Sequence, residues 1–200
     1  MVLGYHLIMT TYGFWLPNDP RGSWSKYVGN EHLFEVAGRA TKTTERRSLA
    51  GCPHDRAVRR DAKKSLQRPP VLLDGRQALA VSRGFAERLQ ADGMVVWPCA
   101  IMPDHVHLAV ARSRHKIEYV ARRLKAGATK HLTRERRHPF ARYVEASGKL
   151  PTPWARGEWK VFLDSPDDIL RAISYAEQNP IKAGLRPQNW PFVVPYQHFV

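Results

Sequence analysis

Two closely spaced histidines are the residues of this chain whose type and position most directly suggest chemistry. His105 and His107 lie one residue apart in the apolar run MPDHVHLAV. In an extended strand both imidazoles point to one face together with Ala109, and the intervening hydrophobic residues point to the other. Two imidazoles and one further oxygen or nitrogen ligand suit a divalent ion that keeps open positions for substrate oxygens. The pattern therefore predicts core on one strand face and a metal site on the other.

A second candidate group lies in the segment SPDDILRAISYAEQNPIKAGL. Ser165 is a good N-cap and Pro166 fits the first helical position, whereas Pro180 predicts that the helix ends at Asn179. Tyr175 and Asn179 are four residues apart, so they project together from the flank of the apolar stripe. A tyrosine hydroxyl can attack a phosphodiester and form a covalent phosphotyrosine, which conserves the bond energy for rejoining.

Purely structural roles are open for each of these residues. A strand histidine is often structural, and an isolated His-x-His pair also occurs in zinc hydrolases and cupins. Tyr175 could cap the core with its ring, and Asn179 before Pro180 could act only as a helix stop. Cys52 and His54 in GCPHD offer two ligands, which are too few for a metal site.

The elements that must position these residues can be predicted from periodicity. The segments that alternate as strands or repeat as helices cover residues 5–12, 75–91, 94–101, the strand with both histidines, 117–132 and 158–164. This β-α-β-β-α-β order predicts an α+β fold of the ferredoxin-like type, with an antiparallel sheet that has two helices on one face and an open second face. We expect the helix that begins at 166 to be an added C-terminal catalytic helix. Pro98 predicts an edge strand or a bulge.

Length and composition predict a single domain over residues 1–200. With 200 residues and 43% hydrophobic side chains, the chain can bury a full core. Residues 25–70 are basic, polar and weakly periodic, which indicates an arm inserted after the first strand. The tail at 185–200 is apolar in WPFVVPYQHFV, so we expect it to cover the site, fill a groove or contact a partner.

The formal net charge of +14 predicts a polyanionic partner, namely nucleic acid. The sequence has no long uncharged apolar run and no signal peptide, so we expect no membrane partner and a cytoplasmic, nucleoid-associated protein. In GFWLPNDPRGSW, Trp15 and Trp24 are candidates for base stacking and Arg21 for phosphate or base contacts, although an ordered loop explains them equally well. Candidate phosphate contacts on and after the second helix are Arg122, Arg123, Lys125, Lys130, Arg134, Arg136 and Arg137.

Both motifs also resemble those of a known family. PDHVHL resembles the histidine-hydrophobe-histidine motif of the HUH single-strand endonucleases, and YAEQNPIKAGL resembles the tyrosine segment of single-tyrosine insertion-sequence transposases. Together with TTYGFWLPNDPRGSW and WARGEWKVFLDS, the similarity is to the REP-associated tyrosine transposases.

The resemblance implies that His105, His107 and Asn179 bind Mg²⁺ or Mn²⁺ and that Tyr175 is the nucleophile. It further implies nicking and joining of single-stranded or hairpin DNA through a 5′-phosphotyrosine intermediate, by a monomer or a homodimer. A catalytically silent DNA-hairpin binding protein is the alternative hypothesis. A basic RNA-binding module is a third, which is disfavoured because the predicted open face presents histidines where such modules present aromatic residues.

Overall fold

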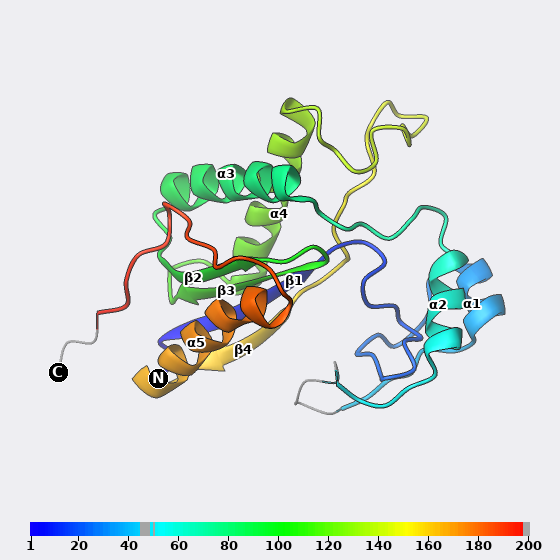
Figure 1. Cartoon of the computed structure of the whole chain (residues 1–200), viewed down its shortest axis with the longest axis horizontal. Helices are drawn as coiled ribbons and strands as arrows, with labels where there is room; N and C mark the ends of the chain where they lie inside the picture. The colour runs from blue at the N-terminus through cyan, green and yellow to red at the C-terminus, as the bar shows by residue number, and fades with distance from the viewer. Residues whose placement is uncertain (45–48, 50, 198–200) are drawn as a thin grey trace. The chain divides into compact units, whose positions relative to one another are not determined.

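The computed structural model describes residues 1–44, 49 and 51–197 (Figure 1). The chain divides into two compact units, one formed by Met1–Thr11 with Leu72–Val200 and the other by Tyr12–Val71. The segment expected to be an inserted arm, 25–70, lies within the second unit. This unit contains helices α1 (Glu31–Ala37) and α2 (Arg56–Lys64), in a segment whose sequence is only weakly periodic.

The first unit is built around a four-stranded sheet, counted over the described residues. Its strands are β1 (Gly4–Thr10), β2 (Val96–Ile101), β3 (His105–Ala111) and β4 (Trp159–Leu163). Their order across the sheet is β2-β3-β1-β4, and every neighbouring pair is antiparallel. The predicted α+β class with an antiparallel sheet is therefore confirmed.

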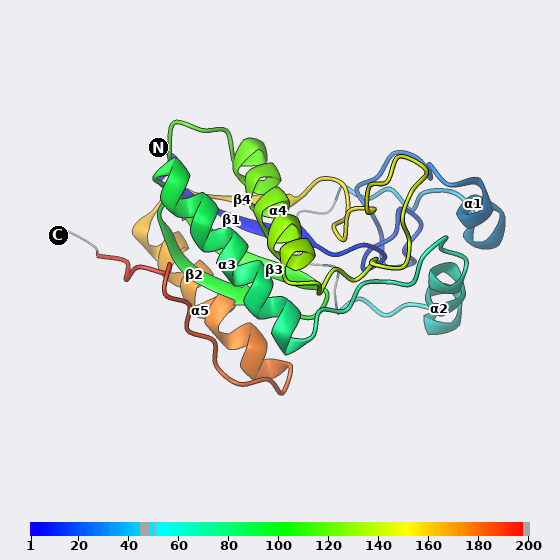
Figure 2. The same cartoon turned by 90° about the horizontal axis from the view of Figure 1, so that it is seen from above.

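Three helices cover this sheet. They are α3 (Gly75–Asp92), α4 (Ile117–Arg134) and α5 (Pro166–Lys182). Figures 1 and 2 show α3 and α4 together on one face and α5 on the other. The face expected to be open is thus partly covered, because Ile169 and Ala172 of α5 pack on Ala109 and Leu163. Alternation along β3 leaves both histidines on the α5 face.

The ends of the long helices follow local signals in the sequence. Gly93 ends α3 in the left-handed conformation, with a φ of 60°, as its position predicted. Ser165 begins α5 and forms a capping box with Asp168. The predicted end of this helix at Asn179 is wrong, because α5 continues through Pro180 to Lys182. The proline removes one backbone donor, and its ring is buried.

The edge of the sheet at β2 is protected in two ways. Pro98 lies between Val96 and Cys99, where the β2–β3 register shifts, so both parts of the prediction for Pro98 are confirmed. The C-terminal tail then runs along this edge. The Val194 amide donates to the Val96 carbonyl at 2.9 Å, and the Gln188 amide side chain bonds both backbone groups of Ile101. The described part of the tail therefore covers backbone groups that an exposed edge would leave free to pair with other chains.

Two glycines set the close packing of α3 on α4. A Cβ atom at Gly84 would lie 2.5 Å from the backbone carbon and oxygen of Gly127. We expect Gly84→Ala to destabilise the protein by about 1–3 kcal/mol, because a helix backbone must move to admit the methyl group. Urea unfolding measures this loss. Gly75→Ala is the matched control, since a Cβ atom there meets nothing within 4 Å. Equal stability of the two variants would contradict the packing argument.

Candidate active site

Three side chains from three elements meet on the α5 face of the sheet. The ring of Tyr175 lies 5.3 Å from that of His107 and 5.6 Å from that of His6, measured between centroids, and both contacts are edge-to-face. The Nε2 atom of His6 lies 3.0 Å from Nδ1 of His107. His107 is only 3% exposed, whereas Tyr175 is 46% exposed. The tyrosine thus lies over the buried histidines of its own chain with a side accessible to solvent.

The register of the sheet explains why these residues meet. In the β1–β3 pair, His6 is opposite Ala109 and Ile8 is opposite His107. His6 is therefore a diagonal neighbour of His107 on the same sheet face, within reach of a ring. The apolar stripe of α5 docks Ile169 and Ala172 on this face, which brings the helix flank with Tyr175 over the histidines.

His105 has an orienting partner as well. Its Nδ1 atom lies 2.6 Å from Oδ1 of Asp104, and its ring meets that of His107 edge-on, with centroids 4.7 Å apart. A carboxylate only accepts, so Nδ1 of His105 is the donor in this contact. A carboxylate behind an imidazole is the usual outer partner of a metal-binding histidine.

Burial keeps the two inner imidazoles neutral. Desolvation, followed by the charges of His105 and His6, lowers the pKa of His107 to about 2. Burial also lowers the pKa of His6 to about 4. A neutral imidazole has one donor and one acceptor nitrogen. When Nδ1 of His107 donates to His6, Nε2 of His107 carries the lone pair that a metal ligand requires.

Asn179 lies one turn after Tyr175, as its spacing predicted. Its Nδ2 atom donates to the Tyr175 carbonyl at 2.7 Å. This bond leaves the side-chain oxygen of Asn179 as the ligand atom it could offer.

The donor atoms fit a divalent ion in part. Nδ1 of His105 contacts Asp104 and Nδ1 of His107 contacts His6, and an outer partner on the second ring nitrogen is typical of metal-binding imidazoles. Within the described residues, however, no group of three or more His, Cys, Asp or Glu side chains is placed to hold a metal ion. A third ligand would therefore have to be an amide such as Asn179, a water molecule or a substrate oxygen.

The candidate DNA contacts on α4 lie away from this cluster. Helix α4 covers the opposite face of the sheet from α5 (Figure 2). Arg123 pairs with Asp92 at 2.9 Å, Lys130 pairs with Glu87 at 2.9 Å, and the Lys125 ammonium donates to the carbonyls of Ala155 and Gly157. The exposed members of the predicted set are Arg122, Lys130, Arg134 and Arg136, while Arg137 is partly buried.

The other candidate DNA contacts belong to the 12–71 unit. The guanidinium of Arg21 lies 3.7 Å from the centroid of the Trp15 ring and forms two 2.8 Å bonds to the buried Asp19 carboxylate. Trp15 also donates to the Gly22 carbonyl, so this part of the loop is internally ordered. Trp24 is 50% exposed.

Two residues of the cluster escaped the sequence analysis. His6 lies in the run YHLIMT and would have been noticed only once β1 was paired with β3. Asp104 directly precedes His105 in PDHVHL, and its carboxylate next to a candidate ligand was a usable signal. Finding His6 requires the tertiary structure, whereas Asp104 could have been found from its position next to His105 in the sequence.

Comparisons with known proteins give similarity of structure only. No family model matches the chain, and no curated protein resembles it in sequence. One similar solved structure is a REP-associated tyrosine transposase bound to a REP hairpin, with 17% identity and a TM-score of 0.45, over 64% of this chain and 70% of that one. Another is a proposed transposase from Deinococcus radiodurans R1, with 16% identity and a TM-score of 0.42, over 89% of this chain and 91% of that one. The chain is similar to these structures of transposases. Among its described residues, no helix has the length and apolar character needed to span a membrane.

Proposed function

We propose that this protein is a transposase-type enzyme that nicks and rejoins single-stranded or hairpin DNA with Tyr175 as the nucleophile. One observation carries the proposal. The exposed Tyr175 ring lies over His107, at 5.3 Å between centroids, and His107 and His105 share a strand face with their Nδ1 atoms engaged. A nucleophile beside two oriented imidazoles that can hold a divalent ion is an arrangement that supports phosphodiester transfer.

The chemistry balances without an external energy source. The Tyr175 hydroxyl loses its proton to solvent or a nearby base, and its oxygen attacks the phosphorus of a phosphodiester. The new bond joins phosphorus to the tyrosine oxygen, and the bond from phosphorus to the 3′ oxygen breaks. The 3′ oxygen takes up a proton to become a free hydroxyl, and the 5′ phosphate stays on Tyr175. A 3′ hydroxyl that attacks this phosphotyrosine reverses both changes and restores a continuous strand.

His105 and His107 would hold Mg²⁺ or Mn²⁺ through Nε2, with Asn179 as the proposed third protein ligand. When bound, such an ion polarises the phosphodiester and neutralises the charge that develops during displacement. The remaining work belongs to the chain. Asp104 orients the ring of His105, His6 selects the tautomer of His107, and the apolar contacts of α5 hold Tyr175 over the pair.

A covalent-adduct assay tests the proposal. The full chain is incubated with end-labelled DNA hairpins from its own genomic flanks, with Mg²⁺, Mn²⁺ or a chelator, and analysed on a denaturing gel. We expect a metal-dependent protein–DNA adduct whose digest carries the phosphate on the peptide with Tyr175. Tight hairpin binding without an adduct in any metal would overturn the enzymatic proposal and favour a silent DNA-binding protein.

The orienting partners give a separate prediction. Asp104→Ala and His6→Ala each remove a contact to Nδ1 of a proposed ligand, so we expect Mn²⁺ affinity to fall by about 10–100-fold. Isothermal titration with Mn²⁺ measures this change. His6→Gln keeps a polar group near His107 and should recover part of the loss. Wild-type Mn²⁺ affinity in both alanine variants would show that these partners do not serve a metal site.

A further inference from the structure

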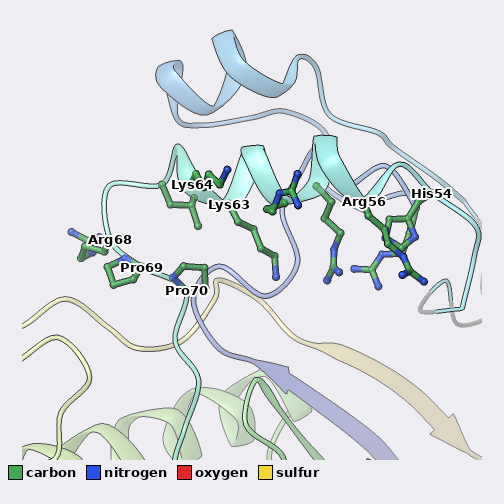
Figure 3. A pocket seen from close by; sticks show the side chains of 11 residues that line it. His54, Arg56, Lys63, Lys64, Arg68, Pro69 and Pro70 are labelled. Carbon is green, nitrogen blue, oxygen red and sulfur yellow. The ribbon is translucent and has the colours of Figure 1, made fainter.

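A second concentration of charge lies in the 12–71 unit, apart from the residues assigned to the active site. Eleven residues of this unit line a hollow of about 860 Å³ (Figure 3), and seven of them are Lys or Arg. Helix α2 supplies most of these cations, namely Arg56, Arg59, Arg60, Lys63 and Lys64. Among the described residues of the unit, no Asp or Glu lines the hollow. Such a concave surface of one sign concentrates anions.

The amphipathic character of α2 explains how the cations come to share one wall. Ala62 on the inner side of the helix is buried with Leu16 and Leu33. The basic side chains occupy the other side, and in Figure 3 those of Arg56 and Lys63 extend from the helix into the hollow. Within α2 itself, Asp61 pairs with Lys64 at 3.0 Å and lies 3.9 Å from Arg60.

A buried carboxylate orients two further cations of the hollow. Asp19 accepts bonds from Arg21 at 2.8 Å and from Arg59 at 3.2 Å, and its side chain is fully buried. Burial alone would raise the pKa of Asp19, but the hydrogen bonds from Arg21 and the charge of Arg59 lower it. The carboxylate therefore stays ionised and holds both guanidinium groups in fixed positions. Fixed donors lose less conformational entropy when they bind an anion.

The spacing of the cations suits a strand of phosphates better than a single anion. Arg56, Arg60 and Lys63 follow one another at helical intervals of four and three residues, so they lie on one side of α2. They span about 10 Å of the helix, which equals about three phosphate-to-phosphate steps along one strand of B-form DNA. Leu66, Pro69 and Pro70 add an apolar wall to the same hollow, where a sugar can pack.

We infer that this hollow, which is built from residues other than those of the candidate active site, binds the phosphodiester backbone of DNA. The choice of DNA among nucleic acids rests on the proposed function. The phosphate-binding role itself rests on the cation arrangement of α2 and on the Asp19 contacts. Several of the cations predicted on α4 pair with groups of the protein itself. The cations of the hollow are a further part of the net positive charge that can bind DNA.

The test is a binding measurement that needs no cleavage. Fluorescence anisotropy follows the full chain with a labelled DNA strand of about 20 nucleotides, in chelator, between about 50 and 200 mM salt. The pocket variant carries Arg56→Gln, Arg60→Gln and Lys63→Gln, which leaves Asp19 and its partners intact. The matched control carries Lys26→Gln, Arg39→Gln and Lys42→Gln, three exposed positions of the same unit that do not line the hollow. Circular dichroism melting verifies that both variants fold.

We expect the pocket variant to bind about 100-fold more weakly at 0.1 M salt. The slope of log K against log salt should become less negative by about 2, since each phosphate contact with a single strand contributes about −0.7. The control variant should change neither quantity comparably. Equal losses in the two variants would overturn the proposal, because net charge alone would explain them. Competition by millimolar inorganic phosphate would overturn it in favour of a single-anion site. A selective loss of binding to phosphatidylserine vesicles, with DNA binding intact, would assign the hollow to a membrane surface.

These outcomes are independent of catalysis. The chelator removes metal, and the same titration can be made in a Tyr175→Phe background. The DNA-binding proposal for the hollow can therefore be rejected even when the adduct assay supports the enzymatic proposal. The reverse result, selective DNA binding by the hollow without any adduct, would retain this inference and reject the enzymatic proposal.

Discussion

Tyr175→Phe is expected to abolish the covalent protein–DNA adduct and to lower strand cleavage by about three orders of magnitude or more. The variant lacks the only atom that the mechanism joins to phosphorus, so the covalent step has no substitute. The phenol is 46% exposed, so its removal leaves no large buried polar defect, and stability should change by only a few tenths of a kcal/mol. Denaturing gels measure the adduct, and thermal melting verifies the fold.

Tyr119→Phe is the matched control for this prediction. Tyr119 lies on α4, on the sheet face opposite the cluster, and its ring stacks on His115 at 4.8 Å. It should retain wild-type adduct formation. An adduct that persists in Tyr175→Phe and disappears in Tyr119→Phe would place the nucleophile on the wrong side of the sheet for this proposal.

The second large effect is expected from the histidine pair. A His105→Ala, His107→Ala variant should lose metal-dependent cleavage almost completely, by about 10³-fold, because both proposed imidazole ligands are removed. DNA binding in chelator should stay close to that of the wild type, since neither residue lines the basic hollow. Comparison of cleavage rates over a Mn²⁺ series with anisotropy in chelator separates the two properties.

Burial of His107 requires a control for folding. Because this residue is 3% exposed, the double variant could lose stability, so His105→Ala alone is measured in parallel. The single variant should fold normally and need a higher Mn²⁺ concentration for cleavage. His115→Ala, a change at another histidine outside the cluster, should leave the metal dependence unchanged. A double variant that folds and cleaves with wild-type metal dependence would remove the histidines from the mechanism.

Local sequence signals predicted the elements that carry the site. Alternation along MPDHVHLAV places His105 and His107 on the opposite face from the buried Leu108, and the Ser165 cap starts α5 where it was predicted. Both depend on neighbours within a few residues, which is why the sequence alone could predict them. The prediction of where α5 ends was wrong for the same reason, because it also relied only on neighbouring residues. The rule for a residue before proline is local, whereas burial of the Pro180 ring depends on the folded structure.

The composition of the site was decided by tertiary structure. His6 and His107 are 101 positions apart in the chain, and only the β1–β3 register brings their rings into contact. The same holds for the α4 cations, whose charge was visible but whose internal partners were not, such as Asp92 for Arg123. In the 12–71 unit, Asp19 and Arg59 are 40 positions apart and meet behind the basic hollow.

The sequence by itself determined the chemical types, the strand face of the histidines and the overall positive charge. Only the folded chain decided which charges neutralise one another and which remain available, because ion pairs and ring contacts depend on distances in space that residue spacing does not encode.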